Sequence, residues 1–257
     1  NPAGLGIYRS SEVVGTLSLS SIDTKSNWNG NVSKDDKSKL SFDNFSYVGY
    51  FPTANESGIM SWNIGLSYNR LKNFNRNYRL SGSQAYSLAD YAADISYGIH
   101  ENDLIYVKDS YDPYNNPNNP WMSVLGYEAG YFGSFLNDRS SYHSGFGTSN
   151  ATGDIWYADS PQNTTLNVSE KGAVDQYNFA FATNISNSVF LGATLAVTDI
   201  NYSISSIYDE RFEGGDYLYL DNGLTTEGTG YSFNLGAIVR PVDFLRMGVA
   251  YNSPTSH

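Results

Sequence analysis

Strict two-residue alternation of side chains is the feature that most constrains the fold of this chain. From residue 60 to residue 68, one set of positions is bulky and apolar and the set between them is small and polar; the two sets are Met60, Trp62, Ile64, Leu66, Tyr68 and Ser61, Asn63, Gly65, Ser67. Successive side chains of a β-strand point to opposite faces. The pattern therefore predicts a strand with one apolar face and one small polar face.

The same alternation recurs along the chain. It is clear over residues 177–182, 189–197, 231–239 and 245–252, and it is less regular at about 11–22 and 38–51. Together with residues 60–68, these segments predict seven strands, with cores of about nine to twelve residues. A tilted strand needs about this length to cross the hydrocarbon layer of a membrane.

The lengths of the connections also alternate. Short connections are expected near 52–58, 184–188 and 241–243, and long ones at 23–37, 72–172 and 206–225. Short turns on one side and long loops on the other are typical of outer-membrane β-barrels, in which the short turns are periplasmic. We therefore predict an all-β fold, a transmembrane antiparallel β-barrel with a long, partly helical extracellular loop at 72–172.

A soluble β-sandwich is the alternative, because its strands alternate as well. The polar faces decide between the two folds. They carry Ser, Asn, Gly and Ala, whereas a sandwich strand usually presents Lys, Glu or Thr to water. Small polar groups suit the enclosed lumen of a barrel, and the alternating loop lengths favour the barrel too.

Composition excludes several classes of function. Lys and Arg number 15 against 26 Asp and Glu, a net charge of −11 that argues against a nucleic-acid partner. The chain has no Cys, so disulfides and thiolate sites are absent. No run of 18 apolar residues occurs, which excludes a transmembrane helix.

The odd strand count bears on how much of a barrel is present. Bacterial single-chain barrels have an even number of strands, and unpaired edges in lipid cost several kcal/mol per unsatisfied backbone group, roughly. We therefore expect about as many strands again to lie outside this sequence. The chain opens on Asn1 and not on Met, and we expect its true N-terminus upstream.

Two short motifs resemble the FadL/TodX family of outer-membrane transport proteins. The opening run Asn1-Pro2-Ala3-Gly4-Leu5 resembles the Asn-Pro-Ala element of that family's N-terminal plug, the hatch. Residues 240–255, from Arg240-Pro241-Val242-Asp243 to Tyr251-Asn252-Ser253-Pro254-Thr255, resemble its periplasmic hairpin and the following strand. Residues 7–50 resemble a branch described as haemin receptors.

This resemblance implies a 14-stranded barrel with the hatch inside it. Residues 1–10 would be the end of the hatch, with Asn1, Pro2 and Ala3 as its coupling element, and residues 11–257 the first half of the barrel. An ordinary Asn-Pro turn is the alternative for residues 1–3. The length of the 72–172 connection departs from the family, so its ligand residues cannot be transferred one by one.

The long connection holds two segments of helical period. Leu88, Tyr91, Ile95 and Ile99 share one face, and a second face carries Trp121, Val124, Leu125, Ala129, Phe132 and Phe135. These helices either form an apolar surface that captures substrate, as the resemblance also implies, or cover each other and stabilise the loop. The candidate ligand-binding residues are Leu88, Tyr91, Ile95, Trp121, Leu125, Phe132 and Phe135.

Two arginines fall on the small polar face near the last short turn. Arg240 and Arg246 should then point into the lumen, where a buried cation needs carboxylates or carbonyls of the hatch as partners. Either a structural salt bridge or a role in shaping the exit path would explain them.

Nothing in the sequence favours catalysis or a metal. His100, His143 and His257 have no metal-binding spacing, and no Gly-x-Ser-x-Gly elbow occurs. The oxygen-rich run 109–116 lacks the Gly and Glu of a calcium loop. We expect no enzyme, no metal and no cofactor, and no His pair suited to haemin ligation is evident.

The expected function is passive uptake of small hydrophobic molecules, such as long-chain fatty acids or aromatic hydrocarbons, across the cell outer membrane. The expected partners are the hydrophobic substrate and the lipid and lipopolysaccharide of that membrane. The alternative is a barrel that docks a protein partner in a secretion or surface-anchoring complex. A plugged lumen with no apolar cavity would favour docking.

Overall fold

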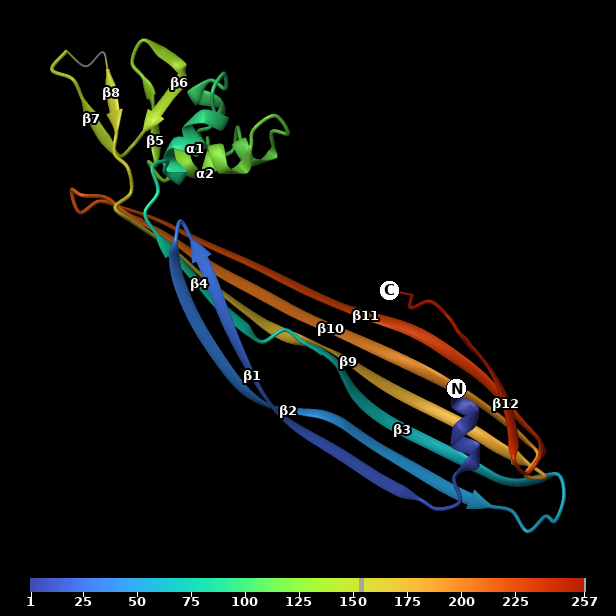
Figure 1. The fold of residues 1–257 in the computed structure, drawn as a ribbon. Helices are drawn as coiled ribbons and strands as arrows, with labels where there is room; N and C mark the ends of the chain where they lie inside the picture. The colour runs from blue at the N-terminus through green and yellow to red at the C-terminus, as the bar shows by residue number, and fades with distance from the viewer. Residues whose placement is uncertain (153–154, 257) are drawn as a thin grey trace.

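The computed structural model describes residues 1–152 and 155–256. One antiparallel sheet, curled into a half-barrel, dominates it (Figure 1). Its strands follow the order β1-β2-β3-β9-β10-β11-β12, and an extra strand, β4, pairs with β9. Their bounds are β1 Glu12–Trp28, β2 Asn31–Pro52, β3 Ile59–Asn73, β4 Arg76–Gly82, β9 Asn163–Ile185, β10 Val189–Arg211, β11 Tyr217–Val242 and β12 Leu245–Asn252.

All seven strands expected from the alternation lie in this sheet, and the antiparallel all-β prediction is confirmed. The two-sheet sandwich is not what the described residues form, because no second large sheet faces the first. No helix in the described part of the chain has the length and apolar character needed to span a membrane.

The two faces of the sheet differ as their alternation predicted. The bulky set lies on the convex face, where Leu66, Phe179, Leu195 and Phe233 stand side by side in register and remain about half exposed. We call this surface the apolar band; its members are Trp62, Ile64, Leu66, Tyr177, Phe179, Phe181, Leu191, Leu195, Tyr231, Phe233, Leu235, Met247, Val249 and Tyr251. The small polar set faces the hollow of the curved sheet.

Six of the seven expected strands are longer than nine to twelve residues, and β12, with eight, is shorter. β9 and β10 each have 23 residues and β11 has 26, so the sheet continues well beyond the apolar band. The long loops expected at 23–37 and 206–225 are therefore wrong. Residues rich in Ser, Asn and Asp form strand there, because each backbone group pairs with the neighbouring strand even where no apolar face is buried.

Residues 23–37 instead form a tight hairpin. Asn29 and Gly30, with φ of 48° and 87°, make the turn between β1 and β2. A two-residue type I′ turn requires a positive φ at both of its central residues, and Asn-Gly is its preferred sequence. Between β10 and β11, only residues 212–216 lie outside the strands.

The connection expected at 72–172 is also shorter than predicted. β4 and the first part of β9 take up its two ends, which leaves residues 83–162, here called the loop lobe. The lobe contains α1 Leu88–Ile95, η2 Glu101–Asp103, η3 Pro113–Asn115, α2 Trp121–Glu128, β5 Phe132–Phe135, β6 Asp138–Ser144, β7 Gly147–Ser149 and β8 Trp156–Ala158. It sits at the end of the sheet opposite the short turns (Figure 1).

The second helix does not reach Phe135. It ends at Glu128, and Phe132 and Phe135 belong to β5. Gly130 adopts a φ of 73°, and the amide of Tyr131 donates to the carbonyl of Gly126. This left-handed glycine stop ends a helix, so the helical period read through residue 135 was partly fortuitous.

The described residues have one main apolar core, and it lies in the lobe. It consists of Ala92, Ala93, Leu104, Met122, Val124 and Phe132, with Leu88 and Ile95 packed against it. The lower part of the half-barrel has no comparable core among the described residues, since the bulky side chains of the apolar band point outward.

Candidate functional site

The N-terminal residues form a short plug on the concave face of the sheet. The 3-10 helix η1, Pro2–Ile7, lies inside the curve near the short turns (Figure 1). Asn1 starts it: its side-chain oxygen accepts from the amide of Ala3 at 3.0 Å. The side-chain nitrogen Nδ2 of Asn1 donates to the carbonyls of Ala237 in β11 (3.3 Å) and Val249 in β12 (3.1 Å), which ties the plug to two strands.

A row of small residues in the sheet makes room for this plug. Asn63, Ala182, Gly192, Gly236 and Ala250 occupy facing positions in five neighbouring strands. A Cβ on Gly192 would lie 2.6 Å from the amide nitrogen of Ala3, and one on Gly236 would lie 2.9 Å from Cδ of Pro2. Only glycine lets the plug backbone approach this closely.

Asn63 holds the other end of η1. It is fully buried, and its amide nitrogen donates to the carbonyls of Leu5 and Tyr8. The plug is thus fixed at both ends by asparagine side chains that bond to backbone carbonyls. No ion pair of the described residues takes part, so the attachment is polar but uncharged.

A cavity of about 300 Å³ lies between η1 and the sheet wall. Leu5 and Tyr8 line it from the plug, and Val48, Gly65 and Ala180 line it from the wall. Ser46, Ser67 and Asn178 add the few polar groups. A mostly apolar pocket with a few polar groups suits a small hydrophobic ligand.

A second cavity marks a break in the wall. β3 is bulged between Arg70 and Lys72, and the chain leaves the sheet briefly before β4 begins. The bulge turns Phe74 toward Tyr202, with ring centres 4.9 Å apart. These rings and Ile22 of β1 line a space of about 460 Å³ together with five polar or charged residues, Lys72, Asn73, Asn75, Arg76 and Glu170.

Next to this break, β2 and β4 are not joined as strands of one ladder. β2 pairs with β3 only from Asn44 to Pro52, and β4 pairs with β9. The β1–β2 hairpin contacts β4 through side chains, as in the bond from Lys37 Nζ to Asn77 at 2.9 Å. This stretch of the wall is packed without a backbone ladder between neighbours.

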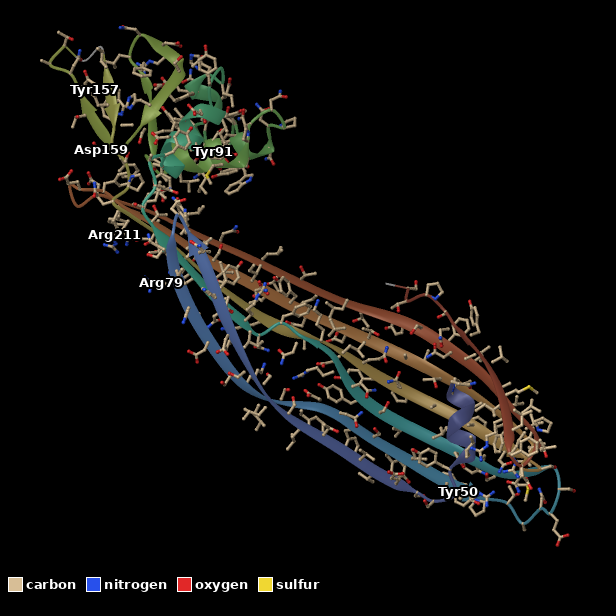
Figure 2. All side chains as sticks on the ribbon, in the orientation of Figure 1. Tyr50, Arg79, Tyr91, Tyr157, Asp159 and Arg211 are labelled. Carbon is tan, nitrogen blue, oxygen red and sulfur yellow. The ribbon has the colours of Figure 1, made fainter. Side chains whose placement is uncertain are left out.

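The structure divides the proposed ligand residues of the lobe between core and surface. Phe132 is buried, and Leu88 and Ile95 pack against the core of the lobe. Leu125 and Phe135 are half-buried. Tyr91 and Trp121 are exposed, and Figure 2 labels Tyr91 within the lobe. The seven residues do not form one continuous apolar surface, because the two helices cover each other.

Charged groups hold the lobe together away from the sheet. Glu101 accepts from Ser134 and from Arg139 Nη1, the latter at 3.0 Å. The hydrogen bond from Ser134, with those from Arg139 and Tyr127, lowers the pKa of Glu101. Burial raises the pKa of Asp90, whose carboxylate accepts from the N-cap amide of α1.

Arg240 is four residues from Gly236 and Arg246 is two residues from Gly248, so each arginine shares a strand face with a glycine that lies next to Asn1. Arg240 therefore shares the face of the plug, but the expected hatch partner is wrong. Arg240 pairs with Asp243 of its own turn at 2.9 Å, an ion pair that needs no group from residues 1–10. Arg246 is exposed.

The histidines of the described residues are not placed as metal ligands. No group of three or more His, Asp or Glu in the described part of the chain could hold a metal ion. His143 lies between the rings of Phe135 and Trp156, 5.0 and 4.2 Å away, and His257 lies outside the described residues.

Several residues of this site were not foreseen. Asn63, Gly192 and Gly236 belong to strands that the alternation located, but only the register reveals that they share one level. A signal was present, since glycine recurs on the small face of successive strands. Comparison with protein-family models, curated proteins and solved structures gives no match to this chain.

Proposed function

We propose that this chain is part of an outer-membrane barrel of the FadL/TodX type, through which small hydrophobic molecules pass without an energy source. The observation that carries the proposal is the contrast between the two faces of the sheet. A wide apolar band is exposed on the convex face, while the concave face is small, polar and occupied by the plug.

The apolar band supports a membrane setting. Exposed apolar patches that span five neighbouring strands, as this one does, are rare on soluble monomers. On β9 the band members are Tyr177, Phe179 and Phe181, and the same face continues through Thr183 to Ile185 at the end of the strand, nine residues in all. That is the number a tilted strand needs to cross the hydrocarbon layer. Tyr177 and Tyr231 stand at one border of the band, where aromatic side chains mark the membrane interface in barrels.

The cavities support passage of apolar molecules. One lies between plug and wall, and the other lies at the break in β3, where aromatic side chains face inward. A molecule that left Tyr91 or Trp121 on the lobe would meet the Phe74 cavity and then the plug. Binding and release in sequence would be enough, because no step needs a bond to be made or broken.

Uptake into proteoliposomes tests the proposal. We expect vesicles with the protein to take up a fluorescent long-chain fatty acid, or naphthalene, several times faster than protein-free vesicles. Ala180→Trp should reduce this rate strongly, because the indole would fill the cavity beside Leu5. Ala193→Trp is the matched control, since Ala193 lies on the convex face and its exchange should leave uptake unchanged.

Equal uptake with and without the protein, for both an acid and a hydrocarbon, would reject passive transport. A wild-type rate that Ala180→Trp does not alter would reject the cavity beside the plug as part of the route.

A further inference from the structure

A buried carboxylate joins the loop lobe to the sheet. Glu210 lies one residue before the end of β10, and its side chain has no exposed surface. No ion pair of the described residues includes it. A buried charge without a cation is costly unless several hydrogen-bond donors surround it.

Four donors surround Glu210, and three of them belong to the segment that leads into the lobe. Oε1 accepts from Gln84 Nε2 at 2.7 Å, from the amide of Leu88 at 3.0 Å and from the hydroxyl of Tyr208. Oε2 accepts from the hydroxyl of Ser87. Ser87 is the N-cap of α1, and its oxygen also accepts from the amide of Ala89. The carboxylate therefore completes the cap of a helix more than 120 residues away.

Apolar contacts surround this polar centre. Ala89 of the lobe packs with Phe212 and Leu218, which follow β10 and begin β11. The ring of Phe146 stacks on Phe212 with centres 4.2 Å apart. Water is thus kept from Glu210, and each of its hydrogen bonds is correspondingly strong.

We propose that Glu210 is a latch that holds the loop lobe in one position over the end of the half-barrel. Its four donors come from both sides of the junction, so the lobe cannot tilt away without leaving a buried carboxylate unsatisfied. With Glu210 in place, the lobe keeps one fixed orientation relative to the sheet. Arg211 and Arg79 lie at this same junction (Figure 2), but neither donates to Glu210.

Hydrogen exchange of the reconstituted protein tests the latch. In Glu210→Gln, a side-chain NH₂ group replaces one of the two acceptor oxygens. It then faces a group that also donates, so that hydrogen bond is lost. We expect exchange of the α1 amides, from Leu88 to Asp90, to rise at least tenfold, while amides of β10 near Leu195 remain as slow as before. Glu170→Gln is the matched control, because Glu170 is a nearly buried carboxylate of the same wall that pairs with Arg76. It should leave the α1 amides unchanged.

Tyr208→Phe covers the case in which Glu210→Gln does not fold. It removes one donor and keeps the charge, so we expect a smaller rise confined to the same amides. Unchanged α1 exchange in a folded Glu210→Gln protein, or an equal rise in Glu170→Gln, would overturn the latch. The result does not depend on the transport proposal, since hydrogen exchange reports on the junction whether or not any molecule passes.

Discussion

Glycine at two facing positions decides whether the plug can lie against the wall. The backbone of Pro2 and Ala3 occupies the space in which a side chain at residue 192 would stand, and side-chain atoms of Asn1 and Pro2 occupy the corresponding space at residue 236. Neither glycine has a positive φ, so the reason for glycine is close approach and not backbone conformation.

We predict that Gly236→Ala displaces η1 from the row of small residues. The added methyl group would meet the side chain of Asn1 and Cδ of Pro2, and overpacking of this kind costs about 1–3 kcal/mol. Hydrogen exchange of residues 3–8 should therefore quicken about tenfold or more. Gly228→Ala in the same strand has open space around its Cβ and serves as the control. Equal protection of residues 3–8 in both variants would refute the role of Gly236.

At the scale of elements, the lobe depends on ionised Glu101. Ser134, Arg139 and Tyr127 lower its pKa in the folded state, so its stabilising effect is full above the ordinary value of 4.5. The effect is lost as pH falls through the depressed folded value. Because the partners come from β5, β6 and α2, acid should loosen the contacts between these elements first.

We therefore predict that the lobe of the wild-type protein loses stability as the pH falls below 4.5, and that Glu101→Gln removes much of this dependence. Near-ultraviolet circular dichroism in urea, at several pH values, measures it through the lobe aromatics. Asp138→Asn is a useful comparison, because the hydrogen bonds from Ser141 and Ser140 also lower the pKa of Asp138 but, among the described residues, join it only to its own hairpin. Identical pH profiles for wild type and Glu101→Gln would contradict the prediction.

The sequence located the elements that carry alternating apolar side chains and missed the extent of those that do not. Residues 189–197 stand out because bulky groups alternate there on one face. Further along the same strand the bulky groups Ile200, Tyr202 and Ile204 lie on the opposite face, and the alternation breaks after Ser205. Asn29-Gly30 did carry a hairpin signal, which the charged and polar residues around it obscured. Asn63 and Glu210 could not be assigned, because their partners lie 55 or more residues away.

At the scale of the whole molecule, the apolar band should make the free-energy cost of introducing a charge depend on the position of the residue along its strand. Leu195 lies within the band, and Ser205 lies on the same face of β10 beyond it. A Lys on the lipid side of a barrel costs about 2–4 kcal/mol at mid-depth and much less near the interface.

We predict that Leu195→Lys lowers the free energy of unfolding from phospholipid bilayers by about 2–4 kcal/mol, while Ser205→Lys changes it by less than about 1 kcal/mol. Urea titration of the protein in vesicles measures both. Equal, small effects of the two substitutions would mean that the convex face does not meet lipid.

The length of the strands has a consequence for where molecules are first met. β10 runs for 23 residues, about 75 Å at the usual rise, yet its apolar stretch ends at Val197. If the band sits in the bilayer, residues 198–211, more than half of β10, extend beyond the membrane surface. Under the proposed uptake function, hydrophobic solutes would first meet the protein at this far end of the strands, well away from the bilayer surface.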